Sequence, residues 1–328
     1  MHTPDGLLKQ GLHIDPLDPS TPQPDQSGWS PRRRSAYTSS AMAFYRDALR
    51  LRGVSDIREA VLDDLGTHYG LSKQECVERC LHWEEWSVQE WSKGARSTKE
   101  EITDFYRSTK SWSFDLLWYG YLQAEGHANP VSVAIANTLV RSDLRTPSHL
   151  DFGSGVGTTS QLFRRLGYES SLADISTSLL EFARFRLERR GEAATFIDLT
   201  CQSLEPDRYD VITALDTLVH IPDLPVALTA LHRALKPGGL LFANLDTRPA
   251  TPENAWHLYS DDLPLRWQMH RTGFEPVGRM DHMVPQYRKV ATTGLAHLMR
   301  GGRDYVLLKS PFRPIYRAVK RKVGRFLG

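Results

Sequence analysis

The 328-residue chain contains few cysteines and no long apolar run. Three cysteines are too few for a disulfide framework in a chain of this length, so we expect a cytoplasmic protein. No stretch approaches the ~18 consecutive apolar residues of a membrane span, and the first residues lack the pattern of a signal peptide. The composition, 40% hydrophobic and 24% charged, excludes a wholly disordered, collagen-like or coiled-coil chain.

Cys76 and Cys80 lie one helical turn apart, close to His82. A metal site would need a fourth ligand and a tighter spacing, so the pattern favours two buried helix cysteines and we expect no bound metal.

Charge is balanced overall but unevenly distributed. Residues 311–328 hold six basic side chains and no acidic one, which leaves 35 basic against 39 acidic residues in the rest of the chain. Seven apolar residues of this segment fall on one face of a helix. They are Phe312, Ile315, Tyr316, Val319, Val323, Phe326 and Leu327. We therefore expect a basic amphipathic C-terminal helix over 311–328.

The first 144 residues lack the pattern of a sheet. Residues 1–40 are rich in proline and polar residues and are predicted to form a flexible arm. Residues 41–144 are predicted to form a helical cap, with helices over 41–51 and 56–69 and a long one from Ser72. The spacings Ser72-x-x-Glu75 and Ser97-x-x-Glu100 both suit a capping box at a helix start.

From residue 145 to about 310, short apolar runs alternate with helical stretches at 158–166, 176–190 and 224–235. This alternation predicts an α/β domain with a mostly parallel, doubly wound sheet of seven strands. The last two strands follow where the alternation weakens, so one of them is a candidate antiparallel strand. The predicted strands are Ser148–Phe152, Ser170–Ala173, Ala194–Ile197, Tyr209–Leu215, Leu240–Leu245, Glu275–Met280 and Asp304–Leu308.

The strongest local motif joins the first strand to the first helix of this domain, in the sequence HLDFGSGVG. Gly153 and Gly155 remove side chains where a ligand approaches the backbone, and the helix that follows offers free amide hydrogens. Ser154 lies between them. Asp151, two residues before the first glycine, is placed to accept a hydrogen bond from an ammonium group, which indicates a zwitterionic ligand.

Acidic residues end the second and third predicted strands. Asp174 follows Asp151 by 23 residues, the spacing at which a carboxylate accepts the two hydroxyls of a ribose. Ile175 is then placed to cover an adenine ring, and Asp198 to accept its amino hydrogen. Taken singly these acids suit ordinary turns, but together they indicate a nucleoside.

The order LDFGSGVG, LADIS, FIDLT, YDVITALDTLVHIPD and LHRALKPGGLLFANLD resembles the class I S-adenosylmethionine-dependent methyltransferases, especially their small-molecule branch, over about residues 145–280. The resemblance implies a Rossmann-like fold and S-adenosylmethionine as cofactor, with S-adenosylhomocysteine as product. The methionine part would lie on Gly153, Ser154 and Gly155, the ribose on Asp174 and the adenine near Asp198.

The segment after the fourth strand faces the reactive end of the cofactor in this family, which points here to Leu215, Asp216 and His220. This sequence lacks the Pro-Pro-aromatic motif of enzymes that methylate amino groups of nucleic acid bases. His220 is the best candidate base, because imidazole titrates near neutrality. Asp216 and His257 are further catalytic candidates.

Aromatic residues of the cap and of the segment after the fifth strand are candidates for the substrate pocket and lid. Aromatic faces suit both a sulfonium ion and a planar substrate. The candidates are Tyr106, Trp112, Tyr119 and Tyr259.

These observations predict methyl transfer to an oxygen, nitrogen or carbon atom of a small molecule that is free, lipid-linked or carrier-bound. The alternatives are an NAD-dependent oxidoreductase, which shares the glycine loop and the ribose acid, and a scaffold that binds S-adenosylmethionine without using it. The helix 311–328 would bind a membrane surface, a second subunit or its own domain. Nucleic acid is a poor partner for so balanced a charge.

Overall fold

A computed structural model of the chain describes residues 13–139, 147–244, 247, 251, 256–280, 284–291, 295–311 and 314–315. Within these residues, seven strands form one sheet in the order β3-β2-β1-β4-β5-β7-β6. The sheet confirms the predicted mixed α/β, Rossmann-like fold. The strands are β1 (Ser148–Phe152), β2 (Glu169–Asp174), β3 (Thr195–Asp198), β4 (Tyr209–Ala214), β5 (Leu235–Ala243), β6 (Phe274–Met280) and β7 (Val284–Lys289).

The first five strands are parallel, and β7 runs antiparallel to both of its neighbours, β5 and β6. The predicted strand at Asp304–Leu308 is wrong, because these residues belong to helix α13 (Leu295–Lys309). A short apolar run such as Tyr305–Leu308 does not by itself distinguish a strand from a helical turn. The strand that takes this place in the sheet, β7, was not predicted; Pro285 lies near its start, and proline is uncommon inside a sheet.

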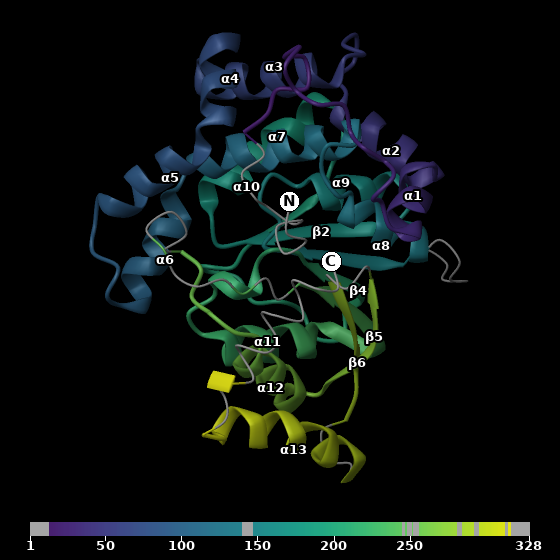
Figure 1. Cartoon of the computed structure of the whole chain (residues 1–328), viewed down its shortest axis with the longest axis vertical. Helices are drawn as coiled ribbons and strands as arrows, with labels where there is room; N and C mark the ends of the chain where they lie inside the picture. Colours follow the sequence, from purple (N-terminus) through teal and green to yellow (C-terminus); the bar gives the residue numbers. More distant parts are fainter. Residues whose placement is uncertain are drawn as a thin grey trace.

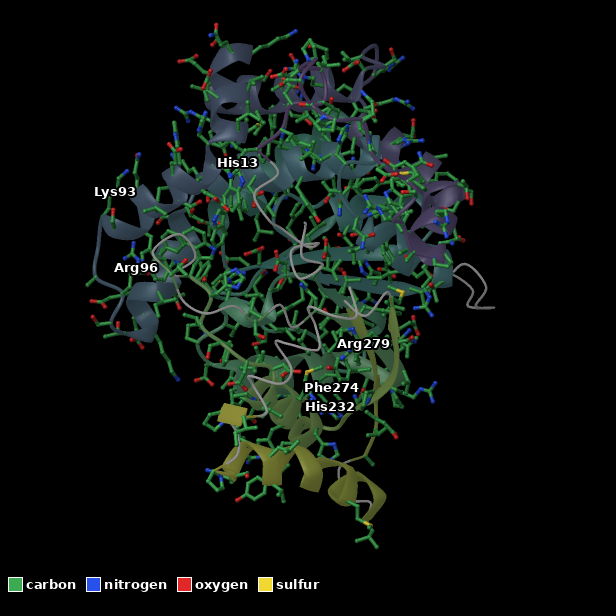
Figure 2. All side chains as sticks on the ribbon, viewed as in Figure 1. His13, Lys93, Arg96, His232, Phe274 and Arg279 are labelled. Carbon is green, nitrogen blue, oxygen red and sulfur yellow. The ribbon has the colours of Figure 1, made fainter. Side chains whose placement is uncertain are left out.

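The helices cover both faces of the sheet (Figure 1). Helices α9 and α10 pack on one face and α11 and α12 on the other, with α13 outside α12. Adjacent strand residues such as Val211 and Ile212 therefore enter two different apolar cores. On the α11 face, His232 and Phe274 lie side by side, their ring centroids 5.5 Å apart (Figure 2). The bounds are α9 (Thr158–Arg165), α10 (Thr177–Arg189), η2 (Leu218–His220), α11 (Leu224–Ala234) and α12 (Leu263–Thr272).

The N-terminal helices form a layer over α9 and α10 and extend to one side of the sheet as α5 and α6 (Figure 1). This layer is the helical region that the sequence predicts before residue 145. Its helices are α1 (Pro31–Tyr37), α2 (Ser40–Leu49), α3 (Ile57–Tyr69), α4 (Lys73–Leu81), α5 (Trp83–Ser92), α6 (Lys99–Ser108), α7 (Ser111–Glu125) and α8 (Val131–Leu139).

Capping side chains set several of these helix starts. The predicted capping box of Ser72 and Glu75 is present at α4. At α6 the box lies one residue later than predicted, on Thr98 and Glu101, because the helix begins at Lys99. Both cysteines of α4, Cys76 and Cys80, are buried as expected.

Residues 13–40 differ from the flexible arm that the composition predicts. Trp29 and Ala36 are buried, and the indole nitrogen of Trp118 donates to the Ile14 carbonyl at 3.1 Å. His13 lies beside α5, with Nε2 3.2 Å from a carboxylate oxygen of Glu84 (Figure 2). Residues 13–30 thus form turns and loops that are held by side-chain contacts, and helix α1 follows them. The predicted amphipathic helix 311–328 lies almost wholly outside the described residues. Among those that are described, no helix has the length and apolar character needed to cross a membrane.

Candidate active site

A cavity of about 560 Å³ opens at the carboxyl ends of the parallel strands, between the sheet and the N-terminal helices. Carboxyl ends of parallel strands are the usual place for a ligand in open α/β sheets. Ten of the predicted site residues line this cavity. They are Gly153, Gly155, Asp174, Ile175, Leu215, Asp216, His220, His257, Tyr106 and Trp112.

The glycine loop after β1 forms one wall of the cavity. Gly153 and Gly155 have φ angles of +69° and +52°, which L side chains rarely adopt. A Cβ atom at Gly153 would lie 2.3 Å from the Thr217 side chain, and one at Gly155 would lie 2.6 Å from Leu116. The loop is therefore packed so closely that only glycine fits at both positions.

Ser154, between the two glycines, is buried, and its hydroxyl oxygen has no hydrogen-bond partner among the described residues. A buried hydroxyl without a hydrogen-bond partner lowers the stability of the folded protein. It is consistent with a polar group of a ligand beside the loop.

Asp174, at the end of β2, ties this loop to the second strand. One carboxylate oxygen accepts from the Gly155 amide at 2.8 Å and the other from the Ser176 amide at 2.9 Å. Burial raises the pKa of Asp174. Each oxygen has further lone pairs, and the residue borders the cavity, so it can also accept hydrogen bonds from a ligand.

Asp151 does not border the cavity. Its two oxygens accept from the Ser160 amide at 3.0 Å and from the Thr213 hydroxyl at 3.2 Å, which joins β1 to α9 and β4. Burial raises the pKa of Asp151 to about 7. The Asp151 carboxylate thus holds the start of α9, and its predicted contact with the ammonium group of a ligand stays a prediction.

Asp198 is likewise outside the cavity lining. It accepts hydrogen bonds from the amide and the hydroxyl of Thr200, and these hydrogen bonds, that of the hydroxyl above all, lower its pKa. The next residue, Leu199, does line the cavity, as do Gln202, Ser203 and Leu204.

The segment after β4 crosses the floor of the cavity in a strained conformation. Asp216 has a φ angle of +54°, and its amide donates to the side-chain oxygen of the buried Asn244. Strained residues of this kind concentrate at functional sites. Leu215, Asp216 and Thr217 all line the cavity, and Thr217 packs against Gly153 of the glycine loop.

His220 follows in the short helix η2. Its Nδ1 lies 3.0 Å from the Trp256 carbonyl oxygen, which can only accept, so Nδ1 carries a proton. In the neutral ring Nε2 is therefore the basic nitrogen. The His257 ring lies 4.7 Å away, centroid to centroid.

Aromatic rings of the N-terminal helices, together with Trp256 from the segment after β5, form the opposite wall. Trp83, Tyr106, Trp112 and Trp256 border the cavity, and the Tyr106 hydroxyl donates to the Trp256 carbonyl at 3.0 Å. The same carbonyl thus contacts both Tyr106 of α6 and His220 of η2. This contact closes α6 over the carboxyl ends of the strands.

Two of the predicted lid residues lie elsewhere. Tyr119 packs among the residues of the first apolar core. The Tyr259 hydroxyl donates to the Ile221 carbonyl at 3.0 Å and supports the segment after η2 from outside the cavity. Trp83, Trp256, Leu116 and Asp115 line the cavity but were not predicted, because only the packing of the folded chain reveals which side chains face the ends of the strands.

The sheet order is that of a mostly parallel, Rossmann-like α/β fold, with the cavity at the carboxyl ends of its strands. Residues 129–278 match the family model described as "Methyltransferase domain". This match supports the resemblance to class I S-adenosylmethionine-dependent methyltransferases that the sequence predicts for this segment.

Among the curated relatives, the ubiquinone biosynthesis O-methyltransferase of Xanthomonas euvesicatoria pv. vesicatoria is 33% identical over 130 residues, which are 38% of this chain and 52% of that protein. The enzyme of the same name from Pseudomonas paraeruginosa is 31% identical over 111 residues, 33% of this chain and 48% of that protein. The chain thus spans about half the length of these relatives.

A solved structure with a similar fold is the PH0226 protein from Pyrococcus horikoshii OT3, which is 17% identical at a TM-score of 0.44. The similarity covers 56% of this chain and 100% of that one.

Proposed function

We propose that the chain transfers a methyl group from S-adenosylmethionine to a small-molecule acceptor. The observation that supports this proposal is the lining of one cavity. The glycine loop and Asp174 border it, and so do the imidazoles of His220 and His257 and the aromatic wall. Donor-binding and acceptor-binding features thus meet in a space of molecular size.

The residues present fit the donor. The close glycine loop and the buried Ser154 hydroxyl suit the methionine part, the Asp174 carboxylate suits the ribose, and Ile175 and Leu199 provide apolar contact for an adenine. When bound, S-adenosylmethionine supplies an already activated methyl group. The protein has to align the acceptor and exclude water, and the aromatic wall of the cap serves both purposes.

For the acceptor we propose a planar, aromatic hydroxyl compound. The indole and phenol rings of Trp83, Tyr106, Trp112 and Trp256 offer apolar faces to a flat ring. His220 Nε2 would take the hydroxyl proton, with His257 beside it, while Asp216 shapes the floor. The similarity to ubiquinone biosynthesis O-methyltransferases supports oxygen as the methylated atom.

A methyl-transfer assay tests this function. Purified protein is incubated with S-adenosylmethionine labelled in the methyl group, together with simple phenols and catechols or with their methyl ethers as matched controls. We expect label in the hydroxyl compounds only, with an equal yield of S-adenosylhomocysteine. Tight binding of S-adenosylhomocysteine without transfer to any acceptor would instead support the non-catalytic scaffold.

We also propose that the C-terminal part of the chain contacts an anionic membrane surface from the cytoplasmic side. Leu295, Met299 and Val306 are 74%, 72% and 63% exposed, and their spacing of four and seven residues places them on one face of α13. The segment 311–328, which has six basic side chains and no acidic one, follows this helix. Apolar and basic residues together suit peripheral binding.

Sedimentation with vesicles tests the membrane contact. The full chain should sediment with phosphatidylglycerol vesicles but not with phosphatidylcholine vesicles, and a variant that lacks 311–328 should stay in solution. Dimerisation that the deletion abolishes, without any vesicle binding, would assign the segment to a subunit interface and overturn the proposal.

A further inference from the structure

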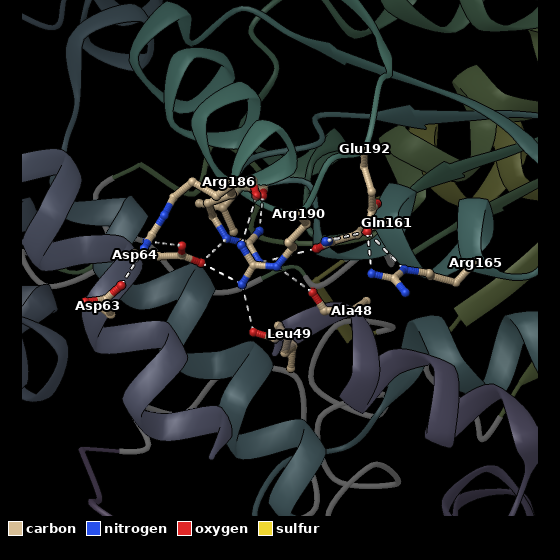
Figure 3. A network of polar contacts seen from close by, with 11 residues as sticks. Ala48, Leu49, Asp63, Asp64, Gln161, Arg165, Arg186, Arg190 and Glu192 are labelled. Carbon is tan, nitrogen blue, oxygen red and sulfur yellow. Dashed lines mark hydrogen bonds and ion pairs between the residues drawn. The ribbon is translucent and has the colours of Figure 1, made fainter. Parts of the chain in front are cut away.

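A buried network of charged residues joins the N-terminal helices to the methyltransferase domain (Figure 3). Its centre is Asp64 of α3, which is fully buried and forms ion pairs with Arg186, Arg189 and Arg190. Arg190 also donates to the carbonyls of Ala48 and Leu49 at the end of α2. The network therefore ties α2 and α3 to the end of α10.

Arg186 extends this network to the glycine loop. Its side chain is fully buried, its Nε lies 3.3 Å from Asp64, and its Nη1 donates to the Val156 carbonyl at 2.6 Å. Its Nη2 lies 3.3 Å from the side-chain oxygen of Gln161 in α9. One guanidinium thus holds a carbonyl of the sequence GSGVG and a carboxylate of the cap at the same time.

The planar guanidinium is required for this double contact. A lysine ammonium keeps the charge but lacks the fork of donors that reaches two acceptors in different directions. Burial above all, and then the nearby Arg190, lower the pKa of Arg186 to about 10, so the group is still charged near neutral pH. A buried positive charge needs a negative partner, and the Asp64 carboxylate forms this ion pair with Arg186.

On the basis of the proposed function, we infer that Asp64 and Arg186 are positioning residues, through which the cap sets the conformation of the glycine loop and thereby the affinity for the methyl donor. Val156 is held by Arg186, and its neighbour Gly155 is held by Asp174. The glycine loop is therefore held by two side chains, Asp174 and Arg186. Arg186 is in turn paired with Asp64 of α3. The cap therefore contributes to donor binding at a distance from its aromatic wall.

The experiment compares three variants of the full chain. Asp64→Asn removes the charge without changing the shape, and Arg186→Lys keeps the charge but loses the double contact. Asp63→Asn is the matched control, because Asp63 is the neighbouring acid on α3, pairs with Arg189, is half exposed and does not contact Arg186. Affinity for S-adenosylhomocysteine is measured by calorimetry well below the unfolding temperature of each variant. Hydrogen exchange of the amides at 155–160 is measured on the same proteins.

We expect Asp64→Asn and Arg186→Lys to weaken the binding of S-adenosylhomocysteine about tenfold, within the usual range of coupling between sites. Exchange of the loop amides should increase in these two variants while exchange in β5 and β7 stays unchanged, a pattern that general destabilisation does not produce. Asp63→Asn should change the affinity by less than about twofold. If Asp64→Asn does not fold, Arg186→Lys decides.

Wild-type affinity and wild-type loop exchange in Arg186→Lys would overturn the inference, as would an equal effect in Asp63→Asn. A wild-type chain that does not bind S-adenosylhomocysteine would count against the proposed function instead. In that case the exchange of the loop amides still shows whether Arg186 holds the loop.

Discussion

The buried carboxyl of Asp151 makes the stability of the protein depend on pH in a predictable direction. Its pKa rises from 3.8 to about 7 on folding, mainly because burial disfavours the charged form. Between these values the folded state binds more protons than the unfolded state, so the free energy of unfolding falls as the pH rises. The full penalty, reached above about pH 7, is on the order of 4 kcal/mol.

The substitution Asp151→Asn removes this titration while leaving hydrogen bonds possible. The amide oxygen can accept from the Ser160 amide, and the amide nitrogen can donate to the Thr213 hydroxyl, which can then turn to His149 Nε2, 2.9 Å away. From about pH 5 to about pH 8, the wild type should lose roughly 3 kcal/mol more stability than the variant.

Urea unfolding, followed by the fluorescence of the eight tryptophans, measures this difference at several pH values. The comparison with the variant is needed because the neighbouring His149 acts in the opposite sense. Burial lowers the pKa of His149 to about 3, so this residue makes stability rise with pH up to about 6.5. Parallel curves for the wild type and Asp151→Asn would refute the reasoning.

Other substitutions test the site itself. Gly153→Ala should weaken the binding of S-adenosylhomocysteine at least tenfold, as measured by calorimetry, because its Cβ would clash with Thr217 at an unfavourable φ angle. His220→Gln should lower methyl transfer to a hydroxyl acceptor about 10²- to 10⁴-fold without changing the affinity for S-adenosylhomocysteine; an unchanged rate would exclude His220 as the base. Tyr106→Phe should lower the free energy of unfolding by about 1 kcal/mol in urea titrations, through loss of the hydrogen bond to Trp256, and an unchanged value would show that this bond is not needed.

The central part of the domain could be predicted from the sequence because its signals are local. Strand β1 has the predicted bounds, and Ser176 caps α10 at the predicted start. The motif from β1 to α9 and the acid at the end of β2 also lie within a few residues of the elements that position them. These features require no knowledge of distant parts of the chain.

The edge of the sheet was harder to predict. Strand β7 contains Pro285, yet it lies between β5 and β6 and pairs with both. The apolar run at 305–308 is helical instead, and Tyr305 packs on Trp267 of α12 with ring centroids 4.9 Å apart. Tertiary packing decides whether each of these two segments is a strand or a helix. A short apolar run in the sequence does not show how it will pack.

The cap side of the site depends on contacts between residues far apart in the sequence. Tyr106 and His220 meet at the carbonyl of Trp256, 150 and 36 residues away respectively. Asp64 and Arg186 are separated by 122 residues. One sequence shows that such residues exist, but only the folded chain shows that they meet.

Calorimetric titration with S-adenosylhomocysteine and, separately, NAD tests the central claim most directly. The wild type should bind S-adenosylhomocysteine and not NAD. Asp174→Ala, confirmed as folded by thermal unfolding, should bind S-adenosylhomocysteine at least tenfold more weakly through loss of charge-assisted hydrogen bonds. Binding of NAD alone, or equal affinity in Asp174→Ala, would contradict the assignment of this cavity to the methyl donor.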